Sequence, residues 1–292
     1  MPSGYNLLGI QESARKQPEM TSTWDERIER ATKLSSVYPF AAEALRFLAQ
    51  VAMLQQKLYV EFKLDPNRFF DMDGSLFGQV HSPALQGRFS TFLASIRQIA
   101  PPGLAKAADC LAEKDSASWL RLIEESWLSP TADGDNQDTK QETMSERCLA
   151  WLFLQPCAEY LAARHKEVLA SGSPTRCPLC GAKPIVGVLR PEGDGAKKSL
   201  ICMLCAYEWA FRRVYCPACG EDKDTQMAFY SAPEIPHVRI DVCDSCHTYL
   251  KTVDLTKTGI AVPVVDEVAA LPLDLWARDN GYHKLQMNIV GI

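Results

Sequence analysis

Two related stretches decide the fold: CPLCGAKPIVGVLRPEGDGAKKSLICMLC (residues 177–205) and CPACGEDKDTQMAFYSAPEIPHVRIDVCDSC (residues 216–246). Each opens with Cys-Pro-x-Cys-Gly and closes with Cys-x-x-Cys. The insert between the two pairs has 21 residues in the first stretch and 23 in the second, and ten residues separate the stretches. This pattern indicates an internal duplication in which a hairpin-sized insert carries one cysteine pair at each end.

A Cys-x-x-Cys pair can present two thiolates to one metal ion from a tight turn. The residue after the second cysteine often needs a positive φ, which Gly181 and Gly220 adopt without strain; Ala206 and His247 occupy the same place in the other two turns. Two such turns complete a tetrahedral four-sulfur site, so the sequence predicts two metal ions. We expect the pairs to combine sequentially rather than interleaved. The first site is then Cys177, Cys180, Cys202 and Cys205, and the second is Cys216, Cys219, Cys243 and Cys246.

The cysteine count and the N-terminus favour metal ions over disulfides. The chain has eleven cysteines, an odd number, and the N-terminal apolar stretch 7–10 is short for a signal peptide and lacks a preceding basic region. We therefore expect a cytoplasmic protein, in which thiols stay reduced. Cys110, Cys148 and Cys157 fall in helical stretches and are expected to be small buried hydrophobic residues.

Three other cysteine chemistries fit less well. A thioredoxin-like dithiol needs one pair at a helix N-terminus, not four pairs. The run CDSCH (residues 243–247) matches a haem c attachment pattern, which requires export and leaves the third pair unused. An iron–sulfur cluster is possible on four cysteines, although cluster motifs usually crowd three of them together.

Four-sulfur sites suit iron and zinc alike, so the spacing does not choose between them. With four protein ligands on each metal no position remains for a catalytic water, and we expect the chain not to be an enzyme. Neither His237 nor His247 is required as a ligand. The run GDGAKKS (residues 193–199) has a glycine-rich look but lacks the spacing of a phosphate loop, and we predict a hairpin turn there.

Charge argues against nucleic acid as the partner. The net charge is −5 and the pI is about 5.6, and residues 177–256 hold nine basic and ten acidic side chains. Four-cysteine sites on divalent metals add further negative charge. A zinc-ribbon nucleic-acid-binding protein nevertheless stays as an alternative. Since no apolar run reaches the ~18 residues of a spanning helix, we expect no insertion into a membrane.

The N-terminal half is predicted to be helical. Phe47, Val51, Leu54, Leu58 and Phe62 recur at steps of three and four, which places them on one helix face. Helices are expected at about 24–38, 86–99, 102–113, 115–128 and 144–170, with exposed loops at 65–83 and 131–143. The predicted divisions are a flexible N-terminus (1–23), a helical domain (24–172), a first module (173–213), a second module (214–262) and a partly helical C-terminal tail (263–292).

The whole set of motifs resembles one known family. The paired cysteines, the run LICMLC (200–205) with Trp209, the run DVCDSC (241–246), and the tail motifs VDE (265–267) and LPLDLWA (271–277) are similar to those of the formate dehydrogenase accessory protein FdhE. The resemblance covers nearly the whole chain.

That resemblance implies a multidomain α+β protein, with an all-α domain followed by two rubredoxin-like, zinc-ribbon-type modules. It implies that the eight paired cysteines bind two metal ions, iron more than zinc. It also implies a cytoplasmic maturation factor that contacts the catalytic subunit of a respiratory formate dehydrogenase. The other candidate function is a rubredoxin-like one-electron carrier.

Overall fold

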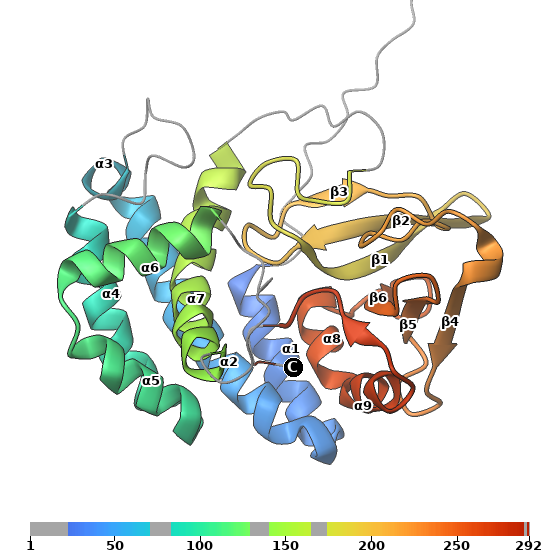
Figure 1. Ribbon diagram of the computed structural model, residues 1–292, viewed down its shortest axis with the longest axis horizontal. Coiled ribbons are helices and arrows are strands. Elements are labelled where there is room, and N and C mark those ends of the chain that lie inside the picture. Colours follow the sequence, from blue (N-terminus) through green and yellow to red (C-terminus); the bar gives the residue numbers. More distant parts are fainter. Residues whose placement is uncertain (1–22, 71–82, 129–139, 165–173, 289–290, 292) are drawn as a thin grey trace, which may run out of the picture.

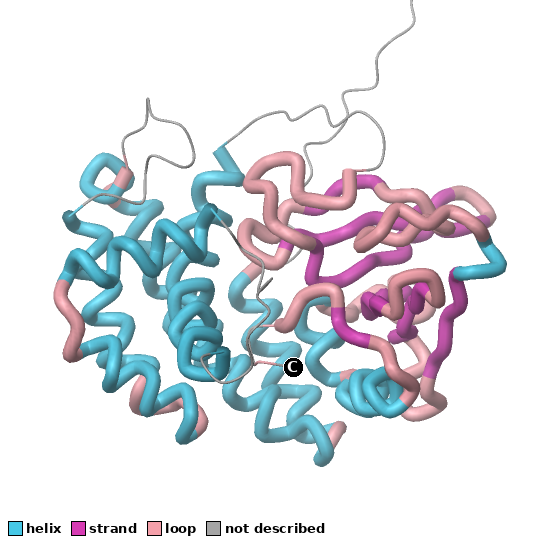
Figure 2. Tube along the Cα trace, viewed as in Figure 1, coloured by secondary structure: helices cyan, strands magenta, loops and turns pink. Residues whose placement is uncertain are grey.

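The computed structural model describes residues 23–70, 83–128, 140–164, 174–288 and 291. Helices form one side of the molecule and strands the other (Figures 1 and 2). This confirms the predicted fold class, a helical N-terminal region followed by a sheet that carries the cysteines and a helical tail. The predicted flexible N-terminus up to residue 22 lies outside the described residues.

The helical half is built on two long helices. Its elements are α1 (Trp24–Val37), η1 (Pro39–Ala41), α2 (Ala42–Leu64), α3 (Pro66–Phe69), α4 (Pro83–Ile96), α5 (Pro102–Ala112), α6 (Ser116–Leu128) and α7 (Lys140–Arg164). Thr23 begins α1 with a capping box to Glu26, which satisfies two backbone N–H groups at the helix start. Among the helices of the described ranges, none combines the length and the apolarity of a membrane span.

The predicted apolar face of α2 is confirmed. Phe47, Val51, Leu58 and Phe62 are buried and Leu54 is half-buried, and they face α7, whose residues Leu149 to Leu154 are buried throughout. Some boundaries differ from those predicted. The fourth helix begins at Pro83, where proline's missing N–H costs no hydrogen bond. The seventh begins at Lys140, earlier than predicted, and the part of this prediction beyond Arg164 lies outside the described residues.

One sheet of seven strands spans both cysteine stretches. The strands are β1 (Pro184–Glu192), β2 (Gly195–Cys202), β3 (Glu208–Ala210), β4 (Met227–Ser231), β5 (Val238–Cys243), β6 (Thr248–Asp254) and β7 (His283–Lys284), with η3 (Asp224–Gln226) leading into β4. The order is β3-β2-β1-β6-β5-β4, and β7 also pairs with β6. The sheet is antiparallel within each stretch, whereas β1 and β6 join the two stretches in parallel, with Gly187 opposite Thr252.

The close approach of β1 and β6 explains a glycine. A Cβ atom placed on Gly187 would lie closer to Oγ1 of Thr252 than any real contact allows. Through the pairing of β1 with β6, the two cysteine stretches form one continuous sheet rather than two separate sheets. The predicted division between modules at residues 213 and 214 stays a prediction.

The C-terminal tail packs between the two sides of the molecule. Helix α8 (Pro263–Ala269) contacts α1 and α2 as well as β1 and β6, and α9 (Leu271–Asp279) follows it (Figure 1). Buried Val265, Val268 and Ala269 share a cluster with Ala31 and Leu45 of the helical side. The helical and sheet halves are thus joined by a common apolar interior.

Candidate metal centres

The first cysteine group lies where the sheet meets the helical half. The loop before β1 supplies Cys177 and Cys180, and the end of β2 with its following turn supplies Cys202 and Cys205. The Sγ atoms of Cys177 and Cys205 are 3.5 Å apart, and those of Cys180 and Cys202 are 3.4 Å apart. All four side chains are buried. The grouping is the sequential one.

The second cysteine group repeats this arrangement at the far end of the sheet. The loop after β3 supplies Cys216 and Cys219, and the end of β5 with its following turn supplies Cys243 and Cys246. The Sγ atoms of Cys216 and Cys246 are 3.7 Å apart, as are those of Cys219 and Cys243. In contrast to the first group, Cys219 is exposed and Cys246 is half-buried.

The sulfur spacing fits a tetrahedral metal ion. Metal–sulfur bonds of about 2.3 Å in a tetrahedron place the sulfurs about 3.8 Å from one another. The spacings of 3.7 Å in the second group agree, and those of 3.4–3.5 Å in the first are slightly tighter. A disulfide would bring two sulfurs to about 2.05 Å, and all cysteines in the described residues are free. The eight side chains therefore offer two complete four-sulfur donor sets, and four thiolates suit zinc or iron.

The buried thiols of the first group require a cation if all four are to be ionised together. Burial raises the pKa of the Cys202 thiol well above its ordinary value. Hydrogen bonds from Cys180, Cys202 and Cys205 lower the pKa of Cys177, so one thiolate is stabilised at the expense of its neighbours. Four thiolates together in a buried group need a positive charge between them. A bound metal ion would supply that charge.

Each cysteine turn has the same backbone shape. In the first turn the N–H of Gly181 donates to the carbonyl of Cys177 (2.9 Å), and in the third Gly220 does so to Cys216 (3.0 Å). The φ angles are +73° at Gly181 and +79° at Gly220, and also +51° at Ala206 and +53° at His247. The two residues that depart from glycine thus adopt the left-handed conformation that the turn requires, at a cost in strain.

Side chains of the helical half support the first site through hydrogen bonds. Gln155 of α7 donates to the carbonyl of Met203, inside the second turn of that site (2.8 Å), and Gln55 of α2 donates to Gln155 (2.7 Å). Trp209 of β3 closes the other side by donating from Nε1 to the carbonyl of Pro174 (2.8 Å). Helices α2 and α7 are therefore coupled to the cysteine turn by hydrogen bonds as well as by packing.

The second site is held by surface residues. Ser245 donates to Glu221 (2.8 Å), and the hydroxyl of Tyr282 donates to Asp244 (2.6 Å). These bonds tie the two turns of the site to each other and to the tail. Because they lie at the surface, this site is more accessible to solutes than the first.

Other predicted residues fall in different places. The hairpin turn predicted at Gly193 is present, between β1 and β2. The metal groups of the described residues include no histidine: Nε2 of His237 lies 2.7 Å from Asp266, and His247 is exposed. The expectation that Cys110 is buried is wrong, because it lies on the outer face of α5.

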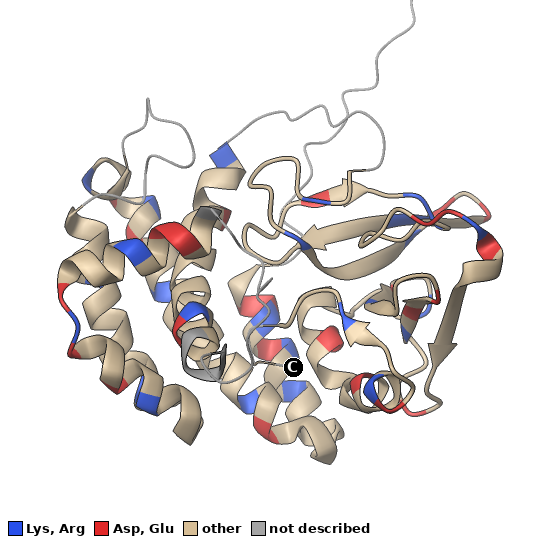
Figure 3. Cartoon of the chain, in the orientation of Figure 1, with Lys and Arg blue, Asp and Glu red and all other residues tan. Residues whose placement is uncertain are grey.

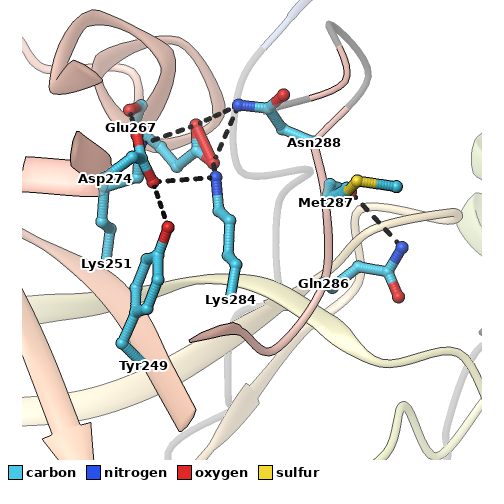
Figure 4. A network of polar contacts seen from close by, with 8 residues as sticks. All are labelled: Tyr249, Lys251, Glu267, Asp274, Lys284, Gln286, Met287 and Asn288. Carbon is cyan, nitrogen blue, oxygen red and sulfur yellow. Dashed lines mark hydrogen bonds and ion pairs between the residues drawn. The ribbon is translucent and has the colours of Figure 1, made fainter. Parts of the chain in front are cut away.

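The tail carries a buried charge network that sequence reasoning missed (Figure 4). Lys251 of β6 has no exposed surface and lies 2.5 Å from Asp274 and 3.6 Å from Glu267. Lys284 lies 2.6 Å from Glu267 and 3.4 Å from Asp274, and Tyr249 donates to Asp274 (2.8 Å). The opposite charges compensate one another where water is excluded.

Asp266, one residue before this network, joins three parts of the chain. It accepts from Arg30 of α1 (2.9 Å at Nε) and from the backbone N–H of Val262 (2.8 Å), and it faces His237, which directly precedes β5. Although burial opposes it, these partners hold the pKa of Asp266 below its ordinary value. The tail motifs 265–267 and 271–277 thus supply acids that attach the tail to the sheet, and Asp266 also attaches it to the helical half. Acidic residues within an otherwise apolar helix were the available sequence signal.

Comparison with known proteins finds one family that is similar to this chain. Models for the central domain and the C-terminal domain of FdhE match residues 176–213 and 214–290. The "Protein FdhE homolog" of Aquifex aeolicus is 33% identical over 141 residues, which are 48% of this chain and 50% of that protein. The homolog of Shewanella oneidensis is 33% identical over 112 residues, or 37% of its length. The region matched by this chain thus spans half or less of the length of these two relatives.

Two further matches extend over most of the chain. The "Protein FdhE homolog" of Stutzerimonas stutzeri is 26% identical over 299 residues, covering 90% of this chain and 88% of that protein. The crystal structure of the FdhE protein from Pseudomonas aeruginosa superposes with a TM-score of 0.70 at 24% identity and covers 94% of this chain and 96% of that one. The latter match shows that the fold is shared from the helical half to the tail.

Proposed function

Because the chain belongs to the FdhE family, we propose that it is a cytoplasmic accessory protein for a respiratory formate dehydrogenase. In this proposal it binds the catalytic subunit of that enzyme and supports formation of its active form, without catalysing a reaction itself. The two four-cysteine groups bind metal ions, iron in preference to zinc. The eight paired cysteines are the ligands.

The observation that carries this proposal is that both donor sets are complete. With four sulfurs around it, a metal ion has no position left for substrate or water, so its role is to hold the surrounding backbone. Metal binding then supplies folding free energy to the turns, above all at the second site, where Cys219 is exposed and Cys246 is half-buried. A rigid sheet with metal-fixed loops, attached to a helical half, is a scaffold suited to protein recognition.

Charge distribution supports a protein partner over nucleic acid. Basic and acidic side chains are interspersed on the sheet half, as Figure 3 shows, rather than gathered into a basic face. Nucleic-acid binding depends on neutralising many phosphates with Lys and Arg. A mixed surface of this kind does not offer that.

The second candidate function, a one-electron carrier, has one observation in its favour. The second site reaches the surface through Cys219, and a solvent-edge site can pass an electron to a partner. Reversible reduction of iron at this site, with the protein intact, would support the carrier function. Zinc in both sites of the protein as isolated would exclude it.

The proposed function is tested by co-purification. The tagged full-length protein is expressed in its own host beside a variant with Cys177→Ala and Cys180→Ala, and beside Cys110→Ala, which removes an exposed thiol outside the metal groups. We expect the catalytic subunit to be retained by the intact protein and by Cys110→Ala, and lost from the double variant. Absence of the catalytic subunit from the intact protein would refute the function, and equal retention by all three would refute the role of the metal.

A further inference from the structure

Strand β4 (Met227–Ser231) is an open edge of the sheet. Within the described residues it pairs with β5 on one side only. The N–H of Asp244 donates to the carbonyl of Gln226 (2.9 Å) just before the strand, and in an antiparallel pair bonded and non-bonded positions alternate. The N–H and C=O groups of Phe229 and Ser231 and the C=O group of Met227 therefore point away from β5, toward the open side, whereas the N–H of Met227 donates to the carbonyl of Asp224 in η3.

The two edges of the sheet are treated differently. The opposite edge, β3, has three residues, and its Glu208 is held in an ion pair with Arg190 at 2.7 Å. A short strand with a charge is a usual protection against unwanted pairing. Strand β4 has the sequence MAFYS, with no charge and no proline. It is the longer edge and the unprotected one, at the far side of the sheet from the helical half (Figure 1).

Aromatic side chains cover both faces of this edge. Phe229 is 63% exposed and Tyr230 is 42% exposed, although both are large and apolar. From Tyr230 a row of rings runs over the tail to the second metal site. The ring centroids are 4.4 Å apart from Tyr230 to Trp276, 6.2 Å from Trp276 to Tyr282, and 5.9 Å from Tyr282 to His247. Exposed aromatic residues of this kind are typical of binding surfaces.

The loops around this edge are acidic. Segments 221–226, 232–236 and 244–247 lead into and out of β4 and β5, and they contain five acidic residues and one basic residue. The acidic residues are Glu221, Asp222, Asp224, Glu234 and Asp244, and the basic one is Lys223. A second copy of this chain would bring the same negative loops against one another. Charge complementarity instead favours a positively charged partner.

We propose that the β4 edge binds an extended, basic segment of a partner protein, which adds to the sheet as an eighth strand. Main-chain hydrogen bonds to Phe229, Ser231 and the carbonyl of Met227 hold the segment. Its side chains on one face lie on Phe229 and those on the other face lie on the ring row, while Lys or Arg at its ends face the acidic loops. Five residues of strand span about 17 Å, so the segment has about five paired residues. This inference rests on the proposed function, since it gives the surface on which the client would bind.

A defined peptide tests the edge without the client. The probe is a fluorescent nine-residue peptide with alternating valine and threonine between pairs of lysines. One control peptide has proline in place of threonine, which cannot pair as a strand, and another has glutamate in place of lysine. Fluorescence anisotropy with the metal-loaded full chain should show binding of the probe, and binding at least about ten-fold weaker for each control.

Three protein variants locate the binding. Phe229→Pro removes an outward N–H without touching the bonds to β5, and Ser231→Lys adds a positive charge to the same edge. Each should weaken binding of the probe about ten-fold. Ala210→Lys places the same charge on the β3 edge, where Ala210 is exposed, and should leave binding unchanged. Metal content and the thermal transition of each variant establish that it is folded, and Ser231→Lys serves where Phe229→Pro fails this check.

Several results would overturn the proposal. These are no binding of the probe by the intact chain, equal binding by Ser231→Lys, or a dimer of the intact chain that Ser231→Lys dissociates, which would make a second copy the occupant. Binding that occurs only after removal of residues 1–22 would make the chain's own N-terminus the occupant. Retention of the catalytic subunit by the intact chain and equally by Ser231→Lys would refute this surface while leaving the proposed function intact.

Discussion

Replacing Lys251 by methionine is the most informative single change for the tail network. The ammonium group has no exposed surface and lies 2.5 Å from Asp274 and 3.6 Å from Glu267. Without it, these two buried carboxylates share the charge of Lys284. Breaking a buried ion pair by removing one partner costs about 3–5 kcal/mol, because an uncompensated charge stays buried. Burial also lowers the pKa of Lys251, so its charged form already carries a desolvation cost, and we expect the lower end of this range.

The assay is urea unfolding at pH 7 with metal in excess, followed by far-UV circular dichroism and tryptophan fluorescence. Lys197→Met is the matched control, because Lys197 is 55% exposed and its pair with Glu192 spans 3.6 Å. An exposed pair contributes about 0–1 kcal/mol, so this variant should unfold almost as the intact chain does. Adding Asp274→Asn to Lys251→Met removes part of the surplus negative charge and should recover part of the loss. A loss below about 1 kcal/mol for Lys251→Met, equal to that of the control, would refute the argument.

Three further predictions concern the metal sites and the pH dependence. A chelator should remove the metal of the second site first, because Cys219 is exposed whereas the first site is fully buried; two equal phases in a dye-based release assay would contradict this. His247→Gly should raise the unfolding free energy by about 0.5–1 kcal/mol, because glycine adopts the positive φ of this turn without strain. Gly181→Ala should lower it by about 1 kcal/mol, because alanine is strained at positive φ even though its Cβ would meet nothing within 4 Å. Melting temperatures that shift in the same direction for both variants would contradict the argument from backbone strain. Although burial opposes it, the charged and hydrogen-bonded partners of Asp266 and Asp274 hold the pKa values of both carboxyls below the ordinary 3.8. The two carboxylates therefore stabilise the fold above that pH, and this stabilisation is lost as the pH falls through the lowered values. The unfolding free energy should drop below about pH 4, and Asp266→Asn should make the drop shallower.

The cysteine spacing was sufficient to predict both four-sulfur groups, because each pair is local and its turn geometry follows from few residues. The apolar face of α2 was predictable for the same reason, since its 3.6-residue period is a local property. The parallel pairing of β1 with β6 was not, because it joins segments that are far apart in the sequence. Cys110 shows a different limit, since the apolar composition of its segment does not say which face of α5 it occupies.

The tail shows most clearly what a single sequence withholds. Glu267 and Asp274 are buried, and although their largely apolar surroundings in the sequence are unusual for acids, they do not identify the partners. Their partners Lys251 and Lys284 come from strands β6 and β7, so the compensation of charge exists only in the folded chain. The positive φ of His247 was likewise not readable from the residue type, because the turn imposes it.

The central claim is that each chain holds two metal ions on two separate four-sulfur sites, and the metal-to-protein ratio tests it most directly. Elemental mass spectrometry on the full-length protein should give two metal ions per chain, one in Cys202→Ser, one in Cys243→Ser and none in the double variant. X-ray absorption at the metal edge should show four sulfur neighbours at about 2.3 Å. A ratio of one or less in the intact chain, or a shell that contains nitrogen or oxygen, would contradict the account.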